Sequence, residues 1–132
     1  MATGRLVRTL QPDVITGGIN AVASVPGGQL ASASDDGVGG QLPRLLVWEV
    51  ATGRLVRMLG RHTDIVNAMA SLPGGLLASA SGDAVQVWEV ETGRLVRTLE
   101  GHTDEVMSLA SLQGGLLASG SMDETVVVWR SN

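Results

Sequence analysis

Histidine, serine and aspartate, which are able to do chemistry together, recur in this chain at a nearly constant spacing. Two sets occur: His62 with Ser79 and Asp83, then His102 with Ser119 and Asp123. Such residues in contact can form a hydrolase triad, and histidine with carboxylates can bind zinc. The triad is disfavoured because each aspartate would lie in a turn and no nucleophile elbow is present. Zinc is disfavoured because each histidine belongs to a different repeat. We therefore expect no catalytic residue, no metal site and no cofactor.

The constant spacing of these sets reflects a repeat that covers the whole chain. Trp48 and Trp88 lie 40 residues apart, and Trp129 follows Trp88 by 41. The sequence Gly-Arg-Leu-Val-Arg occurs three times, with copies 49 and then 40 residues apart. Repeats of this length decide the fold of a chain. We divide residues 1–132 into three units, approximately 3–51, 52–91 and 92–132, and the first carries nine extra residues.

The second unit shows most clearly how a unit is built. Residues that favour β-strands alternate with turn residues, which predicts four strands at 53–59, 65–71, 76–81 and 84–90. No segment shows a helical period, so the chain is predicted to be all-β. Because each sheet has two apolar faces, the sheets should stack face to face, and radial stacking is the propeller solution.

The composition also limits the classes of protein. The chain lacks Phe, Tyr and Cys, so Val, Leu and Ala must form most of the core. Nine arginines oppose thirteen acidic residues, which argues against binding nucleic acid. No apolar run is long enough to span a membrane, and the start lacks a signal-peptide core. We expect a soluble, cytoplasmic protein with no nucleic-acid or membrane partner.

The third unit resembles a WD-repeat β-propeller blade, and the resemblance covers essentially the whole chain in three tandem units. The resemblance is carried by residues 101–104 (Gly-His-Thr-Asp), 117–123 (Leu-Ala-Ser-Gly-Ser-Met-Asp) and 128–129 (Val-Trp). It implies two structural tetrads of hydrogen-bonded side chains: His62, Ser79, Asp83 and Trp88, then His102, Ser119, Asp123 and Trp129. Such a chain of hydrogen bonds satisfies buried polar groups and fixes two loops.

The sequence departs from the family pattern at two kinds of position. Glu or Arg follows each Trp where the family has Asp. In the first unit, Ile15 takes the place of the tetrad histidine, and Asp36 and Trp48 are twelve residues apart. We therefore expect no complete tetrad in that unit.

The nine extra residues of the first unit form two insertions. About two lie between residues 11 and 14, and about seven lie between residues 35 and 44. Both connections would lie on one face of the blade, and insertions on one face often mark a binding surface. Tolerated drift in loop length is an equally good explanation. The candidate residues for binding a protein or peptide are Pro12, Asp13, Val14, Val38, Gln41, Leu42 and Arg44.

Three blades cannot surround an axis, and the resemblance implies rings of roughly six to nine blades. A three-blade arc would expose two apolar faces and an unpaired strand edge. We therefore expect head-to-tail self-assembly, with six blades from two chains or nine from three. A homotrimer is slightly favoured, because near-identical blades lack specialised wedge residues, and a homodimer is a close second.

Residues 3–10 are predicted to be a strand without a blade of its own. The resemblance implies that this strand completes the last blade of a ring, here in a neighbouring subunit beside residues 125–130. The closure residues are Arg5, Leu6, Val7, Arg8, Leu10, Val126 and Val128.

Two functions from different classes agree with these observations. The first is a non-enzymatic WD-repeat scaffold that assembles into a closed propeller and presents a protein-interaction face. The alternative is a purely structural or engineered ring, an evolutionary intermediate with no specific ligand. The irregular insertions argue against an idealised design, which would use equal blades.

Overall fold

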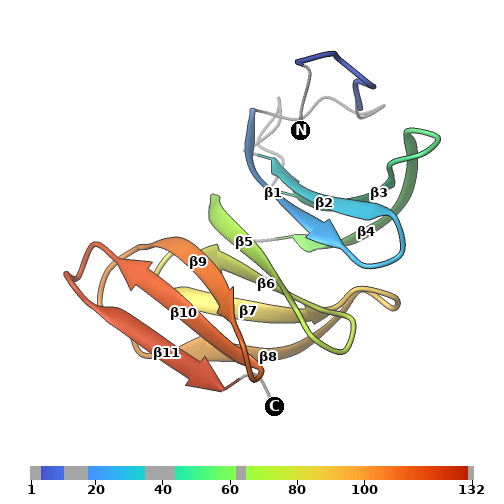
Figure 1. Ribbon diagram of the computed structural model, residues 1–132. Coiled ribbons are helices and arrows are strands. Elements are labelled where there is room, and N and C mark those ends of the chain that lie inside the picture. Colours follow the sequence, from blue (N-terminus) through green and yellow to red (C-terminus); the bar gives the residue numbers. More distant parts are fainter. Residues whose placement is uncertain (1–3, 11–17, 35–43, 62–64, 131–132) are drawn as a thin grey trace.

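The computed structural model describes residues 4–10, 18–34, 44–61 and 65–130 (Figure 1). These residues form an all-β structure of eleven strands and contain no helix. Consequently, no helix in these ranges is long and apolar enough to cross a membrane. The strands are β1 (Ile19–Val25), β2 (Gln29–Ser34), β3 (Arg44–Glu49), β4 (Arg54–Arg61), β5 (Val66–Leu72), β6 (Leu76–Ser81), β7 (Ala84–Glu89), β8 (Arg94–Glu100), β9 (Val106–Leu112), β10 (Leu116–Ser121) and β11 (Val126–Arg130).

The strands form three antiparallel sheets, which we call blades. Blade 1 has the order β1-β2-β3-β4 and blade 2 the order β5-β6-β7-β8. Blade 3 has three strands in the order β9-β10-β11. The predicted all-β fold and the antiparallel strand order are therefore confirmed. Because β4 and β8 each carry the first residues of a new repeat unit, a blade ends one strand after its unit.

Tight glycine turns join the first two strands of each blade. Gly74 and Gly75 lie between β5 and β6 with φ values of 81° and 76°. Residues with a side chain rarely adopt this left-handed region, whereas glycine does so without a steric penalty. The Gly-Gly pairs of the other two blades have the same conformation.

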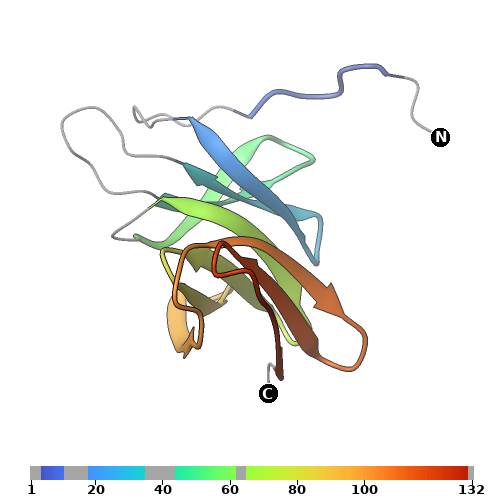
Figure 2. The ribbon, with the colours of Figure 1, turned by 90° about the vertical axis from the view of Figure 1, so that its left-hand side faces the viewer.

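The three blades stack face to face in an arc, as the two views show (Figure 1, Figure 2). The first strands of the blades, β1, β5 and β9, lie side by side and make the main contacts between blades. The outer strands β4 and β8 approach each other much less. This is the wedge arrangement that radial stacking requires.

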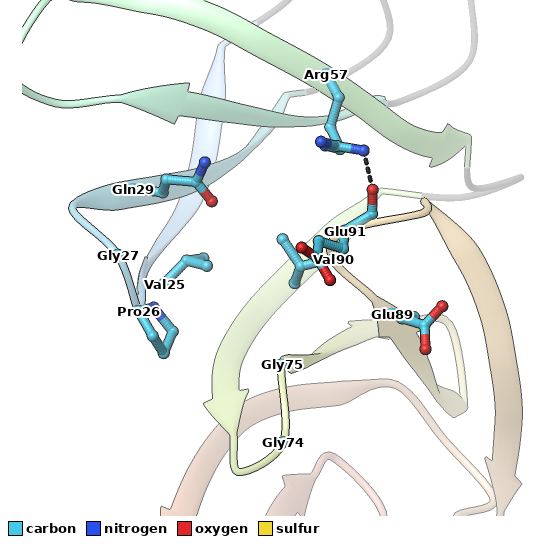
Figure 3. Close-up of a pocket in the computed structure, with 10 residues that line it drawn as sticks. All are labelled: Val25, Pro26, Gly27, Gln29, Arg57, Gly74, Gly75, Glu89, Val90 and Glu91. Atoms are coloured by element: carbon cyan, nitrogen blue, oxygen red, sulfur yellow. Dashed lines mark hydrogen bonds between the residues drawn. The ribbon is translucent and has the colours of Figure 1, made fainter.

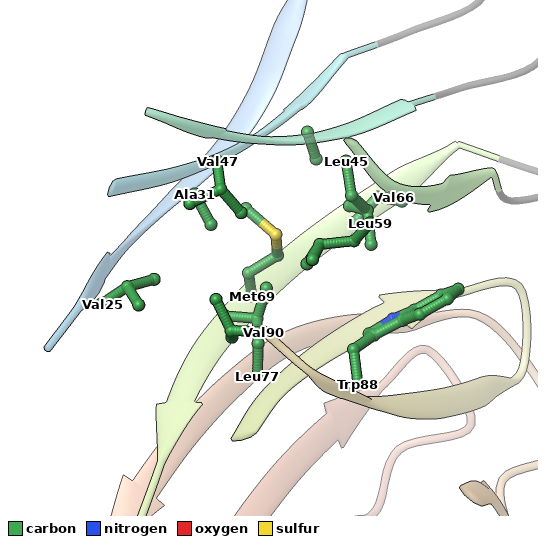
Figure 4. Packing of buried hydrophobic residues seen from close by; sticks show 11 residues of the cluster. Val25, Ala31, Leu45, Val47, Leu59, Val66, Met69, Leu77, Trp88 and Val90 are labelled. Carbon is green, nitrogen blue, oxygen red and sulfur yellow. The ribbon is translucent and has the colours of Figure 1, made fainter. Parts of the chain in front are cut away.

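Two apolar layers fill the spaces between the blades. The first joins blades 1 and 2 and includes Val47, Met69 and Trp88 (Figure 4). The second joins blades 2 and 3 and includes Val87 and Leu117. Burying each large side chain contributes roughly 1.5–3 kcal/mol relative to its exposure. The stacking of the blades, more than any single sheet, therefore stabilises the fold.

Candidate functional site

A chain of hydrogen bonds runs through blade 3 from a tryptophan to an aspartate. Trp129 on β11 donates its indole N–H to the Oγ of Ser119 on β10, at 2.8 Å. The same Oγ lies 2.7 Å from Nε2 of His102, just before β9. His102 Nδ1 lies 2.8 Å from Oδ2 of Asp123, in the turn between β10 and β11. The four residues expected to form the second tetrad are thus in contact.

Asp123 holds together the two loops at this end of blade 3. Its carboxylate accepts hydrogen bonds from the hydroxyl and N–H of Thr125 and from the N–H of Thr103. The Thr125 hydroxyl, aided by these N–H groups and by His102, holds the pKa of Asp123 well below its usual range, although burial opposes the shift. The side chain is therefore a carboxylate near neutral pH.

The contacts of Ser119 oppose a hydrolase role. Its Oγ is buried and already has Trp129 and His102 as partners. A neutral imidazole with its proton on Nδ1 fits both contacts of His102. A serine nucleophile must reach a substrate carbonyl, which a buried hydroxyl held by these two contacts does not. The arrangement satisfies polar groups inside the blade.

Only part of this chain of contacts is described in the other blades. Trp88 donates to Ser79 at 2.8 Å, and Trp48 donates to Ser32 at 2.9 Å. Asp83 is exposed in the turn between β6 and β7. His62 lies outside the described residues, so its contact with Ser79 or Asp83 stays a prediction. The pair of tryptophan and serine is the part that all three blades share.

The other expected site residues are divided between described and undescribed parts of the chain. Pro12, Asp13, Val14, Val38, Gln41 and Leu42 lie outside the described residues. Arg44 begins β3, where it lies opposite Ser34 of β2. Among the described residues, no group of three or more His, Cys, Asp or Glu side chains is arranged to hold a metal ion.

The closure residues belong to two segments, residues 4–10 and β11, which lie at the two ends of the arc (Figure 1). Leu6 and Val7 are strongly exposed in an N-terminal segment, residues 4–10, that belongs to no sheet. β11 pairs with β10 and with no other strand of the described chain. Its residues Val126 and Val128 are 72% and 56% exposed. This chain therefore does not bring the two sets of closure residues together.

The exposed face of blade 3 matches a face that is buried in blade 2. Val85 and Val87 of β7 are fully buried against blade 3. Both strands have the same register against the second strand of their blade, so Val126 and Val128 hold the corresponding positions. The same residue type at the same position is thus buried in one blade and exposed in the next.

The exposed face of blade 1 is the complementary case. Val66 and Met69 of β5 are buried against blade 1. Their counterparts on β1, by register with the second strand, are Ile19 and Val22, which are 50% and 59% exposed. The interface between neighbouring blades occurs twice within the chain. Each end of the arc therefore exposes one of the two faces that form this interface.

The N-terminal segment covers part of the exposed face of blade 1. Leu10 lines an apolar hollow of about 170 Å³ together with Val22, Leu30 and Trp48. By sequence repeat, Leu10 corresponds to Leu59 of β4, which is buried in the layer formed with Met69, Leu77 and Trp88 of blade 2.

Two equivalent glycines show the same relation between an outer segment and the following blade. A Cβ on Gly93 of blade 2 would lie 3.3 Å from the Leu59 carbonyl oxygen. A Cβ on Gly53 of blade 1 would lie 3.3 Å from Arg8 Cδ and 3.4 Å from Leu10 Cδ2. The segment 4–10 therefore lies against blade 1 much as β4 lies against blade 2. Sequence reasoning alone did not find this placement.

A cavity of about 410 Å³ opens between blades 1 and 2, beside their glycine turns (Figure 3). Val25, Gln29 and Val90 contribute to its lining. Arg57 of β4 donates a hydrogen bond across it to the carbonyl oxygen of Glu91, which follows β7. This bond ties the outer strand of blade 1 to blade 2. The sequence signal for it is the arginine that recurs in each Leu-Val-Arg copy.

Comparison with known proteins agrees with this geometry. Residues 93–130 match the WD40 family, described as WD domain, G-beta repeat. The matched range contains β8 to β11 and the whole chain of contacts from His102 to Trp129. The resemblance to WD repeats is therefore confirmed, and the antiparallel sheets are those expected of WD-repeat blades. A comparison with curated proteins found no match. WD40 repeats generally serve as non-enzymatic scaffolds for protein interaction.

Proposed function

We propose that this chain is a non-enzymatic WD-repeat scaffold that joins head to tail with copies of itself into a closed propeller. The ring then presents a protein-interaction face in symmetric copies. One observation carries this proposal: the exposed faces of blades 1 and 3 are the two halves of an interface that the chain already forms between its own blades.

The chemistry of the exposed face of blade 3 supports a copy of this chain as the partner. Exposed Val126 and Val128 correspond to valines that are buried against the next blade. Leaving such a face in water is unfavourable, and exposed apolar patches mark sites of association. A face already complementary to this one exists on blade 1, at Ile19 and Val22.

The N-terminal segment supports the same partner. Arg8 and Leu10 lie against blade 1 as the outer strand of a preceding blade would. The backbone edge of β11 is unpaired within the described chain. An unpaired edge readily accepts a further strand. In the proposed ring, residues 3–10 of one copy form the fourth strand of blade 3 in the next copy.

In the proposed assembly, every junction between chains joins the exposed face of blade 3 to that of blade 1, so the interface is heterologous. The ring closes when the rotation from one chain to the next is a whole fraction of a full turn. Three chains with nine blades are our first expectation, and two chains with six blades are the alternative. Light scattering on the purified chain distinguishes these sizes directly from a monomer of 13.6 kDa.

Deleting residues 1–10 tests the proposal. The truncated chain loses the strand that would pair with β11 and the cover over Trp48 of blade 1, so we expect it to be monomeric. Light scattering of the full-length and truncated chains at matched concentrations measures this, with far-UV circular dichroism as the check on folding. A truncated chain that is folded and keeps the oligomeric size of the parent would contradict strand exchange.

A further inference from the structure

The outer edge of each complete blade carries one ion pair at the same place. Arg54 of β4 lies opposite Glu49 of β3, and Arg94 of β8 lies opposite Glu89 of β7. In both pairs a guanidinium nitrogen lies 3.9 Å from a carboxylate oxygen. The pair recurs because the two blades share this local sequence and the same strand register.

Blade 3 carries the opposite charge at this position. The residue that follows Trp129 is Arg130, whereas Glu49 and Glu89 follow the other two tryptophans. Arg130 lies opposite Leu116 of β10, just as Glu89 lies opposite Leu76 of β6. The two residues are therefore equivalent in register, and the third blade lacks the acidic partner of the outer strand.

We propose that Arg5 lies opposite Arg130 of the partner subunit at each junction of the ring, and that this like-charged pair weakens closure. The proposal rests on the head-to-tail ring proposed above. The register follows from the complete blades, where Leu95 lies opposite Trp88 and Arg94 opposite Glu89. Transferred by sequence repeat, Leu6 lies opposite the partner subunit's Trp129, which brings the two arginines together.

The consequence is a junction that is weaker than the contacts within one chain. Directly opposed like charges on neighbouring strands are destabilising, whereas opposite charges are favourable. Arg5 and Arg130 are both exposed, so solvent moderates the effect and salt screens it. The pair makes assembly depend on protein concentration and ionic strength. The intact pairs instead help to hold the outer strand of blade 1 and that of blade 2 in their own sheets.

Charge reversal tests both the pair and its register. The variants are Arg130→Glu, Arg5→Glu and the double variant, measured by light scattering over a range of concentrations at low salt. Each single variant should assemble at a concentration lower by about threefold to tenfold, because it creates an opposite-charged pair. The double variant should lose this gain, because it opposes two carboxylates. The gap between wild type and each single variant should narrow as salt rises.

Arg97→Glu is the matched control. It changes the net charge by the same amount as either single variant. It lies on β8 of a complete blade, away from the junction, and leaves the pair of Arg94 and Glu89 intact. It should not lower the concentration needed for assembly. A control that lowers this concentration as much as Arg130→Glu does would overturn the pair, because net charge alone would then explain the gain.

The outcomes separate the pair from the ring. If wild type assembles but neither single variant assembles more readily, the pair is overturned and the ring stands. If the double variant assembles most readily of all, the proposed register is wrong. If wild type and all three variants remain monomeric at every concentration, the ring and the pair are both overturned.

Discussion

At the scale of single residues, several side-chain and backbone contacts hold Asp123 in blade 3. It accepts hydrogen bonds from Thr125 and Thr103 and contacts His102. In blade 3, Trp129 and Ser119 are joined to this carboxylate through His102. The function of these residues is to fix two loops and to satisfy polar groups, which is a task different from the hydrolase chemistry that the same residue types can perform.

The lowered pKa of Asp123 predicts how blade 3 responds to acid. Because the folded-state pKa lies below the unfolded value, the carboxylate stabilises the fold above the unfolded pKa of about 4 and loses this effect as pH falls through the folded pKa. Asp123→Asn should lower the melting temperature at neutral pH, and its difference from wild type should shrink progressively below about pH 4.

Thermal unfolding followed by circular dichroism across this pH range measures the effect. Glu124→Gln is the matched control, because Glu124 is the next residue of the same turn but is exposed. A difference between Asp123→Asn and wild type that is the same at neutral and acidic pH would contradict the ionised role of this side chain.

At the scale of elements, the turns decide where each strand ends. Gly75 has φ at 76° and has open space around the position where a Cβ would lie. The effect of a side chain there is therefore purely one of backbone conformation, without any clash. The packing of the sheets does not require a glycine at position 75.

Gly75→Ala should therefore destabilise the fold by roughly 1–2 kcal/mol, which is the strain of a left-handed non-glycine residue. Urea unfolding at a fixed protein concentration measures the change. Gly18→Ala is the control, because Gly18 also has open space around it but has no positive φ. Equal destabilisation by the two substitutions would show that the turn conformation is not the cause.

At the scale of the whole molecule, substitutions on a buried blade face should affect folding, whereas substitutions on an exposed end face should affect assembly. Val87 and Val128 hold the same position in successive blades, but one is buried within the chain and the other is 56% exposed. A charge buried without a partner is strongly unfavourable, whereas an exposed charge is tolerated. The two valines therefore offer a matched pair of substitutions.

Val87→Asp should unfold the chain or destabilise it by several kcal/mol, because an unpaired carboxylate would lie between blades 2 and 3. Val128→Asp should leave each chain folded but prevent assembly, because the charge would lie in the proposed junction. Circular dichroism and light scattering on both variants measure folding and size. A folded Val128→Asp variant that assembles as wild type does would argue against a junction on this face.

Much of the fold was predictable because its determinants are local and repeated. The 40-residue spacing of the tryptophans indicated three units, and the glycine turns between alternating apolar residues indicated antiparallel strands. The observed β6 has the predicted bounds, and the other predicted strands of the second unit shift by one or two residues. The resemblance to WD repeats implied the set of His102, Ser119, Asp123 and Trp129, and these residues are in contact in blade 3.

The sequence by itself determined the repeat, the all-β blades and the tryptophan and serine that pair in each blade. Only the tertiary structure decided that Leu10 and Trp48 of blade 1 line one hollow, that Arg57 reaches Glu91 across the space between blades, and which valines stay exposed. The physical reason is one of range. Strands and turns follow from the preferences of neighbouring residues, whereas these contacts join distant segments and depend on the angle at which the sheets stack.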